Sequence, residues 1–395
     1  MIPQVSRRYP MAHLSRIKRK HCVNPVNTQP QSDRIGAVKR VAIVDDDAAF
    51  RMWVRRMLTA DSRFIVVAEA ANALEAREVV RTARPDVLTL DVEMPGMNGL
   101  EFLARLMAVH PMPVVMMSGR TKQGGANAIH ALSIGAVDCI HKPETGCDRD
   151  TVRSICDRIH LAACSRVIAR AQPVPRPDLS PVSSLTSGPH GQCRRGSLIV
   201  IGASTGGVAA LETVLHDLAA NGPPVMIVQH MPGPFMVSFV ERLNRSLPQR
   251  VHLAFDGAVL ARGDIALAPG FQLHTTLARE DGRWVCRLRP DEGRALHCPS
   301  VDVLFASVVE HAKSVSAALL TGLGRDGANS MKQLHDAGAF TIAQDEDSCV
   351  VFGMPRAAIA EGAVSRVVPL NRIGSVLRQH HDGPRAPATR RGGQV

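Results

Sequence analysis

The chain has 395 residues, of which 45% are hydrophobic but only 3% aromatic, and its formal net charge is +11 at pH 7. This length predicts two or three domains, with cores of Val, Leu, Ile, Ala and Met that suit buried parallel sheets. Every long apolar run is interrupted by charge and residues 1–31 lack an apolar core, which excludes a membrane-spanning helix and a secretory signal. The nine cysteines are irregularly spaced without a C-x-x-C pair, which favours reduced thiols in the cytoplasm over disulfides or a zinc site.

The positive charge is concentrated outside the segments that we expect to fold. Residues 1–38 hold seven Lys or Arg against one acidic residue, and residues 171–196 and 381–395 each hold three against one. The remaining residues are therefore close to neutral. We interpret the basic segments as solvated tails and a linker, so nucleic-acid binding is not expected.

The N-terminal part of the chain divides into an extension and a first domain. Residues 1–38 contain four prolines and no sustained periodicity, which predicts a disordered extension. Residues 39–170 alternate short apolar runs with segments of helical spacing, a pattern that predicts a doubly wound, five-stranded parallel sheet. The expected strands are 41–44, 64–68, 87–90, 114–117 and 137–140, and the expected helices lie near 50–58, 74–82, 100–107, 126–133 and 151–169.

A second α/β pattern follows a linker rich in Pro, Ser, Gly and Arg at 171–196. Residues 197–380 predict another, mostly parallel sheet with helices on both faces, and residues 381–395 a flexible tail. The expected strands are 198–201, 225–228, 251–255, 265–268, 317–320, 340–343 and 366–368, and the expected helices are 208–218, 235–243, 303–312, 328–337 and 355–361.

Polar residues follow four of the expected strands in the first domain. Asp45, Asp46, Asp91, Ser118 and Lys142 all fall at carboxyl ends, which meet in one crevice of an open parallel sheet. Clustered carboxylates need a cation, and hard oxygen ligands suit Mg²⁺. Asp91 is a candidate nucleophile toward a phosphoryl group, with Ser118 and Lys142 supporting the phosphoryl oxygens. A lone Asp after a strand is usually a turn residue, but five such residues favour a site.

The stretches VDDDAAFR, LDVEMPGMNGLEFL, VVMMSGR and GAVDCIHKP resemble the response-regulator receiver family over about residues 39–160. The resemblance implies that a partner sensor histidine kinase phosphorylates Asp91 and that Asp45 and Asp46 help to hold Mg²⁺. Cys139 stands where receivers usually carry an aromatic switch residue, so the usual aromatic coupling is not expected here.

In the second domain the first expected strand ends in Gly202-Ala203-Ser204-Thr205-Gly206, which fits the nucleophile-elbow pattern G-x-S-x-G. A tight strand-to-helix turn exposes the serine hydroxyl and offers free backbone N–H groups to an oxyanion. His230 follows the next strand and is a candidate base, and Asp326 follows the strand near 317–320 and is a candidate orienter. A nucleotide phosphate loop is the alternative for the glycines, although neither G-x-G-x-x-G nor Gly-Lys-Ser/Thr is present.

The blocks IGASTGG, VQHMP, HCPSVDVLF, LLTGLGRDGA and QDEDSCVVFGMPRAA resemble the catalytic domain of chemotaxis protein-glutamate methylesterases of the CheB type. The resemblance implies Ser204 as nucleophile, His230 as base and Asp326 as its partner, with an oxyanion hole from backbone N–H groups near Thr205 and Leu323. It implies a phosphorylation-regulated serine hydrolase that demethylates glutamate methyl esters on cytoplasmic helices of chemoreceptors and deamidates glutamines. No cofactor is implied for the esterase. His297 and Ser300 lie in a matching block, where we expect Ser300 to cap a helix.

Two other functions fit parts of the sequence. A general α/β-hydrolase would need an acid between Ser204 and a later histidine such as His297 or His335. A receiver joined to a nucleotide- or DNA-binding output domain is disfavoured by the charge distribution and by the lack of a helix-turn-helix pattern.

Overall fold

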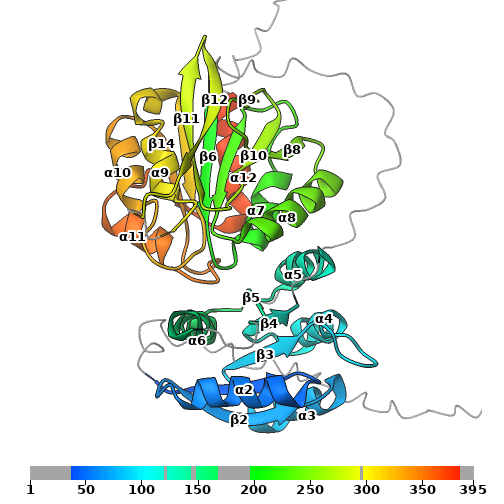
Figure 1. Ribbon diagram of the computed structural model, residues 1–395. Helices are drawn as coiled ribbons and strands as arrows, with labels where there is room; N and C mark the ends of the chain where they lie inside the picture. Colours follow the sequence, from blue (N-terminus) through cyan, green and yellow to red (C-terminus); the bar gives the residue numbers. More distant parts are fainter. Residues whose placement is uncertain (1–36, 120–121, 144–147, 168–195, 294–296, 383–395) are drawn as a thin grey trace, which may run out of the picture. The chain divides into compact units, whose positions relative to one another are not determined.

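The computed structural model describes residues 37–119, 122–143, 148–167, 196–293 and 297–382. They form two parallel-sheet domains, one N-terminal and one C-terminal (Figure 1). The expected N-terminal extension, the linker and the C-terminal tail lie almost entirely outside the described residues. Within the described ranges, no helix combines the length and apolar character needed to cross a membrane.

The N-terminal domain is the five-stranded parallel sheet that the sequence predicts, in the spatial order β2-β1-β3-β4-β5. Its strands are β1 (Lys39–Val44), β2 (Phe64–Ala70), β3 (Val87–Asp91), β4 (Val114–Ser118) and β5 (Asp138–His141). Its helices are α2 (Ala48–Thr59), α3 (Ala73–Ala83), α4 (Gly99–Val109), α5 (Lys122–Ile134) and α6 (Arg149–Cys164).

Alternation along β1 explains how helices cover both faces of this sheet. Val41 and Ile43 pack in a cluster with α2 and α6, whereas Ala42 and Val44 pack with α3, α4 and α5. Successive strand side chains point to opposite faces, so a strand buried on both sides is apolar throughout. Short polar caps then begin the helices; the Asp47 carboxylate, for example, accepts the N–H groups of Ala49 and Phe50 at the start of α2.

The C-terminal domain is built on a seven-stranded sheet whose neighbouring strands are all parallel, in the order β15-β14-β13-β6-β7-β10-β8. The strands are β6 (Leu198–Ala203), β7 (Val225–Gln229), β8 (Arg250–Leu253), β10 (Asp264–Leu267), β13 (Val315–Leu319), β14 (Phe340–Gln344) and β15 (Arg366–Val368). The central strand β6 therefore lies between β13 and β7, which places three loops at one carboxyl edge.

Helices cover both faces of this sheet, as expected. One face carries α7 (Gly207–His216), α8 (Gly233–Ser246) and α12 (Leu370–Asp382). The other carries α9 (Val301–Ala306), the 3₁₀ helix η1 (Val309–Ser314), α10 (Ala328–Asp336) and α11 (Met354–Ala360). Ile199 and Ile201 of β6 face the first group, while Leu198 and Val200 face the second.

A three-stranded antiparallel sheet, β11-β12-β9, is absent from the expected element order (Figure 1). It consists of β9 (Val259–Leu260), β11 (Leu273–Glu280) and β12 (Arg283–Pro290), and it packs with α9 through Leu277, Trp284 and Cys286. Asp281 and Gly282 form the two-residue turn with φ of 49° and 75°. An Asp-Gly pair between alternating strands is a strong hairpin signal, because both turn positions require positive φ.

Among the element ends that differ from expectation, three have identifiable local reasons. Helix α6 ends at Cys164 instead of 169, because Ser165 is extended and its hydroxyl donates to the Ala162 carbonyl at 2.7 Å. The expected helix 303–312 is divided into α9 and η1 after Ser307, whose hydroxyl accepts the N–H of Leu277 in the hairpin. Strand β8 stops at Leu253 before an exposed turn at residues 255–257.

The C-terminal helix α12 was not expected, and the expected tail at 381–395 begins inside it. Ile373, Leu377 and His381 are spaced four residues apart and are buried, so one face of α12 packs on the sheet.

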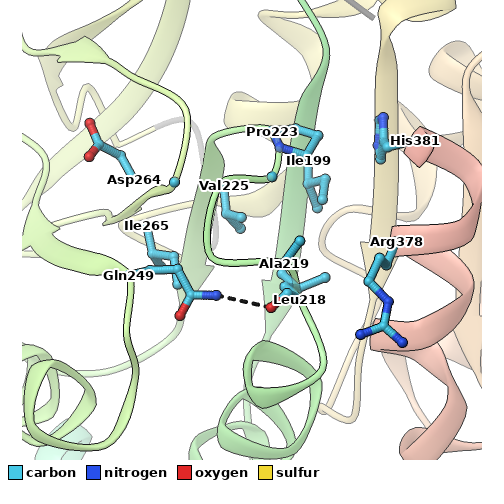
Figure 2. A pocket seen from close by; sticks show the side chains of 12 residues that line it. Ile199, Leu218, Ala219, Pro223, Val225, Gln249, Asp264, Ile265, Arg378 and His381 are labelled. Atoms are coloured by element: carbon cyan, nitrogen blue, oxygen red, sulfur yellow. Dashed lines mark hydrogen bonds between the residues drawn. The ribbon is translucent and has the colours of Figure 1, made fainter. Parts of the chain in front are cut away.

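A small cavity of about 20 Å³ lies at the amino ends of the strands, beside α12 (Figure 2). Gln249 points into it and donates an amide N–H to the Leu218 carbonyl at 3.1 Å. A space of this size accommodates one water molecule and excludes a larger ligand. The predicted site residues follow parallel strands and so lie at the opposite, carboxyl edge of the sheet.

Candidate functional site

The N-terminal domain brings three predicted carboxylates together at the carboxyl ends of β1 and β3. Oxygens of Asp45, Asp46 and Asp91 lie within 4.8 Å of one another. Lys142, just after β5, places its Nζ 2.8 Å from a carboxylate oxygen of both Asp45 and Asp91. Its backbone N–H donates to the carbonyl of Ser118, which ends β4. All five predicted residues therefore lie at one edge of the sheet.

Two buried carboxylates share the single ammonium group of Lys142, and that shapes their ionisation. Burial raises the pKa of Asp91 to about 6; the ion pair with Lys142 opposes this rise, and repulsion from Asp45 adds to it. The pKa of Asp45 is also raised, again chiefly by burial. Ionising the cluster therefore favours the entry of a further cation. The oxygen donors and the negative charge fit Mg²⁺.

Cys139 occupies β5 near this cluster and is only 2% exposed. Burial raises the pKa of its thiol to about 12, so the group is packed and unreactive. An aromatic side chain nearby is instead Phe50 of α2, whose ring centroid lies 4.7 Å from Nζ of Lys142. Sequence reasoning did not single out Phe50 as a neighbour of the cluster.

In the C-terminal domain Ser204 directly follows β6, in the tight turn that the G-x-S-x-G pattern predicts. Its backbone N–H donates to the Thr321 carbonyl, and its carbonyl accepts the N–H of Gly207 at 2.7 Å. Gly206 has φ of 77°, and a Cβ there would lie 2.7 Å from side-chain atoms of Val350. Both the backbone angle and the lack of space therefore require glycine at this position.

The neighbouring strands β7 and β13 bring the other two predicted residues to the same edge. His230 follows β7, and its backbone N–H donates to the carbonyl of Ala203 at the end of β6. Asp326 arrives on the loop after β13, and its Oδ2 lies 2.8 Å from Nε2 of His230. The structure thus joins the predicted histidine and aspartate and holds the backbone of His230 against the nucleophile elbow.

The carboxylate of Asp326 is held by four hydrogen-bond donors. Its Oδ2 accepts from His230 and from the N–H of Val301 at 2.7 Å. Its Oδ1 accepts from the hydroxyl of Ser300 at 2.8 Å and from the N–H of Asp302 at 3.0 Å. Burial raises the pKa of Asp326, but the hydrogen bond and charge of His230 and the backbone N–H groups outweigh burial and lower the pKa to about 2.

The contacts of the His230 ring define which nitrogen faces each partner. Nε2 is taken by Asp326, whereas Nδ1 is buried and has no hydrogen-bond partner among the described residues. With its proton on Nε2, the imidazole presents the lone pair of Nδ1 as the available base. This orientation is the reverse of the Ser-His-Asp arrangement in chymotrypsin, where Nδ1 faces the aspartate.

Backbone N–H groups beside Ser204 remain available for an oxyanion. Within the described ranges, neither Thr205 nor Leu323 donates its backbone N–H to another group. The loop containing Leu323 stays close to the serine because Gly322 packs against it. A Cβ on Gly322 would lie 2.7 Å from Cβ of Ser204 and 2.4 Å from the sulfur of Met354.

Three further residues of this site lie outside the triad that the sequence predicts. Gln229 donates its amide to the carbonyls of Ser204 at 2.9 Å and His230 at 3.2 Å, and so ties the two loops together. His297 stacks on the His230 ring with centroids 4.4 Å apart. Ser300 caps α9, as predicted, and also contacts Asp326. A polar residue directly before the candidate base was the available signal for Gln229.

Of the two alternative histidines of a general hydrolase, His297 lies against His230, whereas His335 lies elsewhere. Its Nδ1 is 3.1 Å from the hydroxyl of Thr341, near the amino end of β14. Parallel strands send their amino ends to the edge opposite Ser204, so this histidine is remote from the elbow.

Comparisons with known proteins agree with the two domains. A family model described as CheB methylesterase matches residues 199–377, and one described as response regulator receiver domain matches residues 41–151. A protein-glutamate methylesterase/protein-glutamine glutaminase of Agrobacterium fabrum is 44% identical over 348 residues, covering 87% of this chain and 97% of the relative. A protein of the same description from Chromohalobacter salexigens is 43% identical, covering 86% and 95%.

Among solved structures, the Thermotoga maritima CheB methylesterase catalytic domain matches with a TM-score of 0.45 and 33% identity, covering 46% of this chain and 97% of that one. The order of the two domains defines a response regulator whose output domain is a methylesterase domain. The identity across nearly the whole length of the relatives specifies more. This chain belongs to the protein-glutamate methylesterase/protein-glutamine glutaminase family.

Proposed function

We propose that this chain hydrolyses the γ-methyl esters of glutamate side chains on the cytoplasmic helices of chemoreceptors. The observation that carries the proposal is the joining of His230 to Asp326 beside the elbow that presents Ser204. Such a site supplies a nucleophile, a base and an orienting carboxylate, which is what acyl transfer from an ester requires. The relatives named above are described as protein-glutamate methylesterase/protein-glutamine glutaminase.

In the proposed reaction the hydroxyl of Ser204 attacks the ester carbonyl while Nδ1 of His230 takes its proton. The negative oxygen of the tetrahedral intermediate is stabilised by the free N–H groups of Thr205 and Leu323. Methanol leaves with a proton from His230, and an acyl-enzyme remains. Water then attacks with the same base, releasing glutamate. Asp326 stays ionised and steadies the imidazolium.

The same acyl-enzyme forms from a glutamine side chain, with ammonia as the leaving group. We therefore infer that the chain also deamidates selected glutamines of its receptor substrates. The leaving amine needs protonation more than methanol does, which gives His230 the same double role as base and then acid.

We also propose that phosphorylation of Asp91 by a sensor histidine kinase controls the esterase. Asp45, Asp46 and Asp91 would hold Mg²⁺, which when bound balances the charge of the incoming phosphoryl group. Lys142 and Ser118 would contact phosphoryl oxygens. Phosphorylation adds about two negative charges at this edge. In the proposed regulation this change shifts the receiver away from covering the esterase cleft.

The test is methanol release from methylated receptor by the full chain, with and without a small phosphodonor and Mg²⁺. Ser204→Ala should lower kcat by about 10⁶-fold, because the covalent route is lost. Full activity in Ser204→Ala would reject the proposed centre, and full activity in His230→Ala would favour a general hydrolase that uses Ser204 with another histidine. Thr213→Ala in α7 is a matched control, since that hydroxyl donates to the carbonyl of Ala209 in its own helix.

A further inference from the structure

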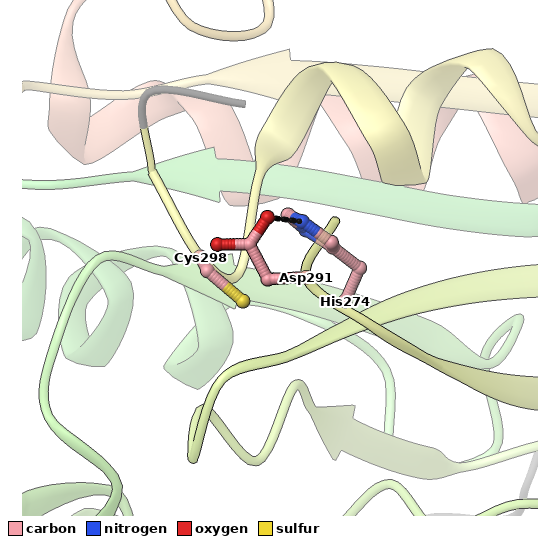
Figure 3. Close-up of side chains that lie close together, drawn as sticks. All are labelled: His274, Asp291 and Cys298. Carbon is pink, nitrogen blue, oxygen red and sulfur yellow. Dashed lines mark hydrogen bonds and ion pairs between the residues drawn. The ribbon is translucent and has the colours of Figure 1, made fainter. Parts of the chain in front are cut away.

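A second aspartate–histidine pair lies outside the proposed triad, at the base of the β11–β12 hairpin (Figure 3). His274 is 6% exposed, and its Nε2 lies 3.3 Å from Oδ1 of Asp291. Cys298 lies beside them, with all three donor atoms within 4.8 Å of one another. The proposed reaction uses none of these side chains.

The hydrogen bonds of His274 fix its proton. Its Nδ1 accepts the backbone N–H of Ser300 at 3.1 Å, so that nitrogen must carry a lone pair. A neutral ring then has its proton on Nε2, where it donates to Asp291. A metal ion on Nε2 would need the lone pair at that position and a proton on Nδ1, facing another N–H. The three side chains are therefore better matched to a hydrogen-bonded chain than to a zinc site.

The chain continues from Ser300 into the proposed catalytic centre. The backbone N–H of Ser300 is held by His274, and the hydroxyl of the same residue donates to Oδ1 of Asp326 at 2.8 Å. Asp326 in turn holds Nε2 of His230 at 2.8 Å. We propose that His274 and Asp291 are positioning residues that orient Asp326 through Ser300; the inference rests on the esterase function proposed above.

The hairpin supplies the rigidity that such a role needs. His274 lies near the start of β11, and Asp291 directly follows β12, so pairing of the two strands brings both to one place. The carboxylate of Asp291 also accepts the N–H of Gly293 at 2.9 Å, which fixes its orientation. The hairpin holds α9 at a second point, where Leu277 donates to the Ser307 hydroxyl.

Without His274 the buried N–H of Ser300 would lose its acceptor, which is a costly state inside a protein. The segment relieves that cost by shifting toward another acceptor, and the shift displaces the hydroxyl that orients Asp326. The result is a misplaced imidazole at an otherwise complete site. Small displacements of a positioned base reduce the chemical step more than substrate binding.

The test compares substitutions at position 274 in the full chain. His274→Ala should lower kcat for methanol release by about tenfold with little change in KM, the effect of one lost buried hydrogen bond. His274→Asn places an amide oxygen close to the position of Nδ1 and should restore most of the rate. Cys298→Ala, in the same cluster, and His335→Ala, at the other end of the sheet, should match wild type.

Two further measurements separate positioning from folding and from the proposed function. The rate at which a fluorophosphonate labels Ser204 should fall in parallel with kcat in His274→Ala, while the thermal midpoint stays close to that of His335→Ala. In a double-mutant cycle, the effect of His274→Ala should largely disappear in a Ser300→Ala background, because both substitutions interrupt one chain.

Equal rates for wild type and His274→Ala, equal loss in the Ala and Asn variants, or additive effects with Ser300→Ala would each overturn the inference. A loss of rate in Cys298→Ala equal to that in His274→Ala would also overturn it in favour of a metal site. If wild type releases no methanol but Ser204 is labelled at a His274-dependent rate, the proposed substrate fails while the positioning role stands.

Discussion

Each domain places an aspartate at the carboxyl edge of a parallel sheet, Asp91 buried and Asp326 mostly buried, yet the two carboxylates are in opposite electrostatic states. Asp91 has a raised pKa of about 6, and Asp326 a lowered pKa of about 2. Burial acts in the same direction on both. The difference lies in the partners: Asp326 receives four donors for itself, while Asp91 shares one ammonium group with Asp45.

This contrast separates a carboxylate that has its full set of hydrogen-bond donors from one that has too few. The carboxylate of Asp326 is fully bonded and has one task, to hold an imidazole in place. The carboxylate of Asp91 is held in an unfavourable state that a cation or a phosphoryl group can relieve. Neighbouring donors, more than depth of burial, therefore decide whether a buried aspartate serves as a fixed support or as a point of control.

The largest expected effect comes from removing the charge of the Asp326 carboxylate. Asp326→Asn should lower kcat by about 10⁴-fold, because an amide stabilises the wrong tautomer of His230 and cannot steady an imidazolium. Initial rates of methanol release from methylated receptor measure this. A loss of less than tenfold would mean that the histidine does not depend on Asp326.

Removing the Asp91 carboxylate should abolish the response to a phosphodonor and leave the basal esterase reaction unchanged. In Asp91→Asn the basal rate of methanol release should equal that of wild type, and a phosphodonor with Mg²⁺ should no longer raise it. The comparison of stimulated and basal rates in both proteins is the measurement. A persisting response would place the phospho-acceptor elsewhere.

The Asp91 carboxylate should also lower the unfolding free energy of the protein at neutral pH. The pKa of Asp91 in the folded protein is raised from 3.8 to about 6, so ionising this carboxyl costs more in the folded than in the unfolded state. The wild type therefore loses unfolding free energy as pH rises through this range. With Mg²⁺ removed, the unfolding free energy of Asp91→Asn should therefore exceed that of wild type by about 3 kcal/mol at pH 7 and by nearly nothing at pH 4, as measured by denaturant titration. Added Mg²⁺ should narrow the gap at pH 7. A gap independent of pH would contradict the assignment.

The Asp326 carboxylate should give the opposite and slightly smaller dependence of unfolding free energy on pH. Its pKa is lowered from 3.8 to about 2, so its stabilisation is complete above pH 4 and is lost as pH falls toward 2. Wild type should exceed Asp326→Asn by about 2 kcal/mol of unfolding free energy at neutral pH, a difference that closes in acid. Urea titrations at several pH values test this, with Asp336→Asn on the surface of α10 as control.

The sequence was sufficient for the two parallel sheets because their strands are short, apolar and separated by clear helical periodicity. It also placed Ser204, His230 and Asp326 at strand ends, since loops after parallel strands share an edge. It missed the hairpin, whose strands carry Thr and Arg at positions where alternation would show apolar residues.

The hydrogen-bond partners of the site residues could not be predicted from the sequence, for a different reason. Ser300 and His274 act through hydrogen bonds across more than 20 positions of the chain, and no local spacing signals a bond between a backbone N–H and a distant imidazole. The pKa contrast between Asp91 and Asp326 is likewise invisible in the residue types, because it depends on how many donors the fold delivers to each carboxylate.

Two neighbouring positions in the loop after β13 should differ sharply in what they tolerate. Gly322 has no space for even a methyl group beside Ser204, while Leu323 is 50% exposed and contributes only its backbone to the proposed chemistry. Attempts to widen or redirect the substrate range of this enzyme should therefore vary the leucine and never the glycine. A new side chain at the first position collides with the serine, whereas one at the second changes only what an incoming substrate meets.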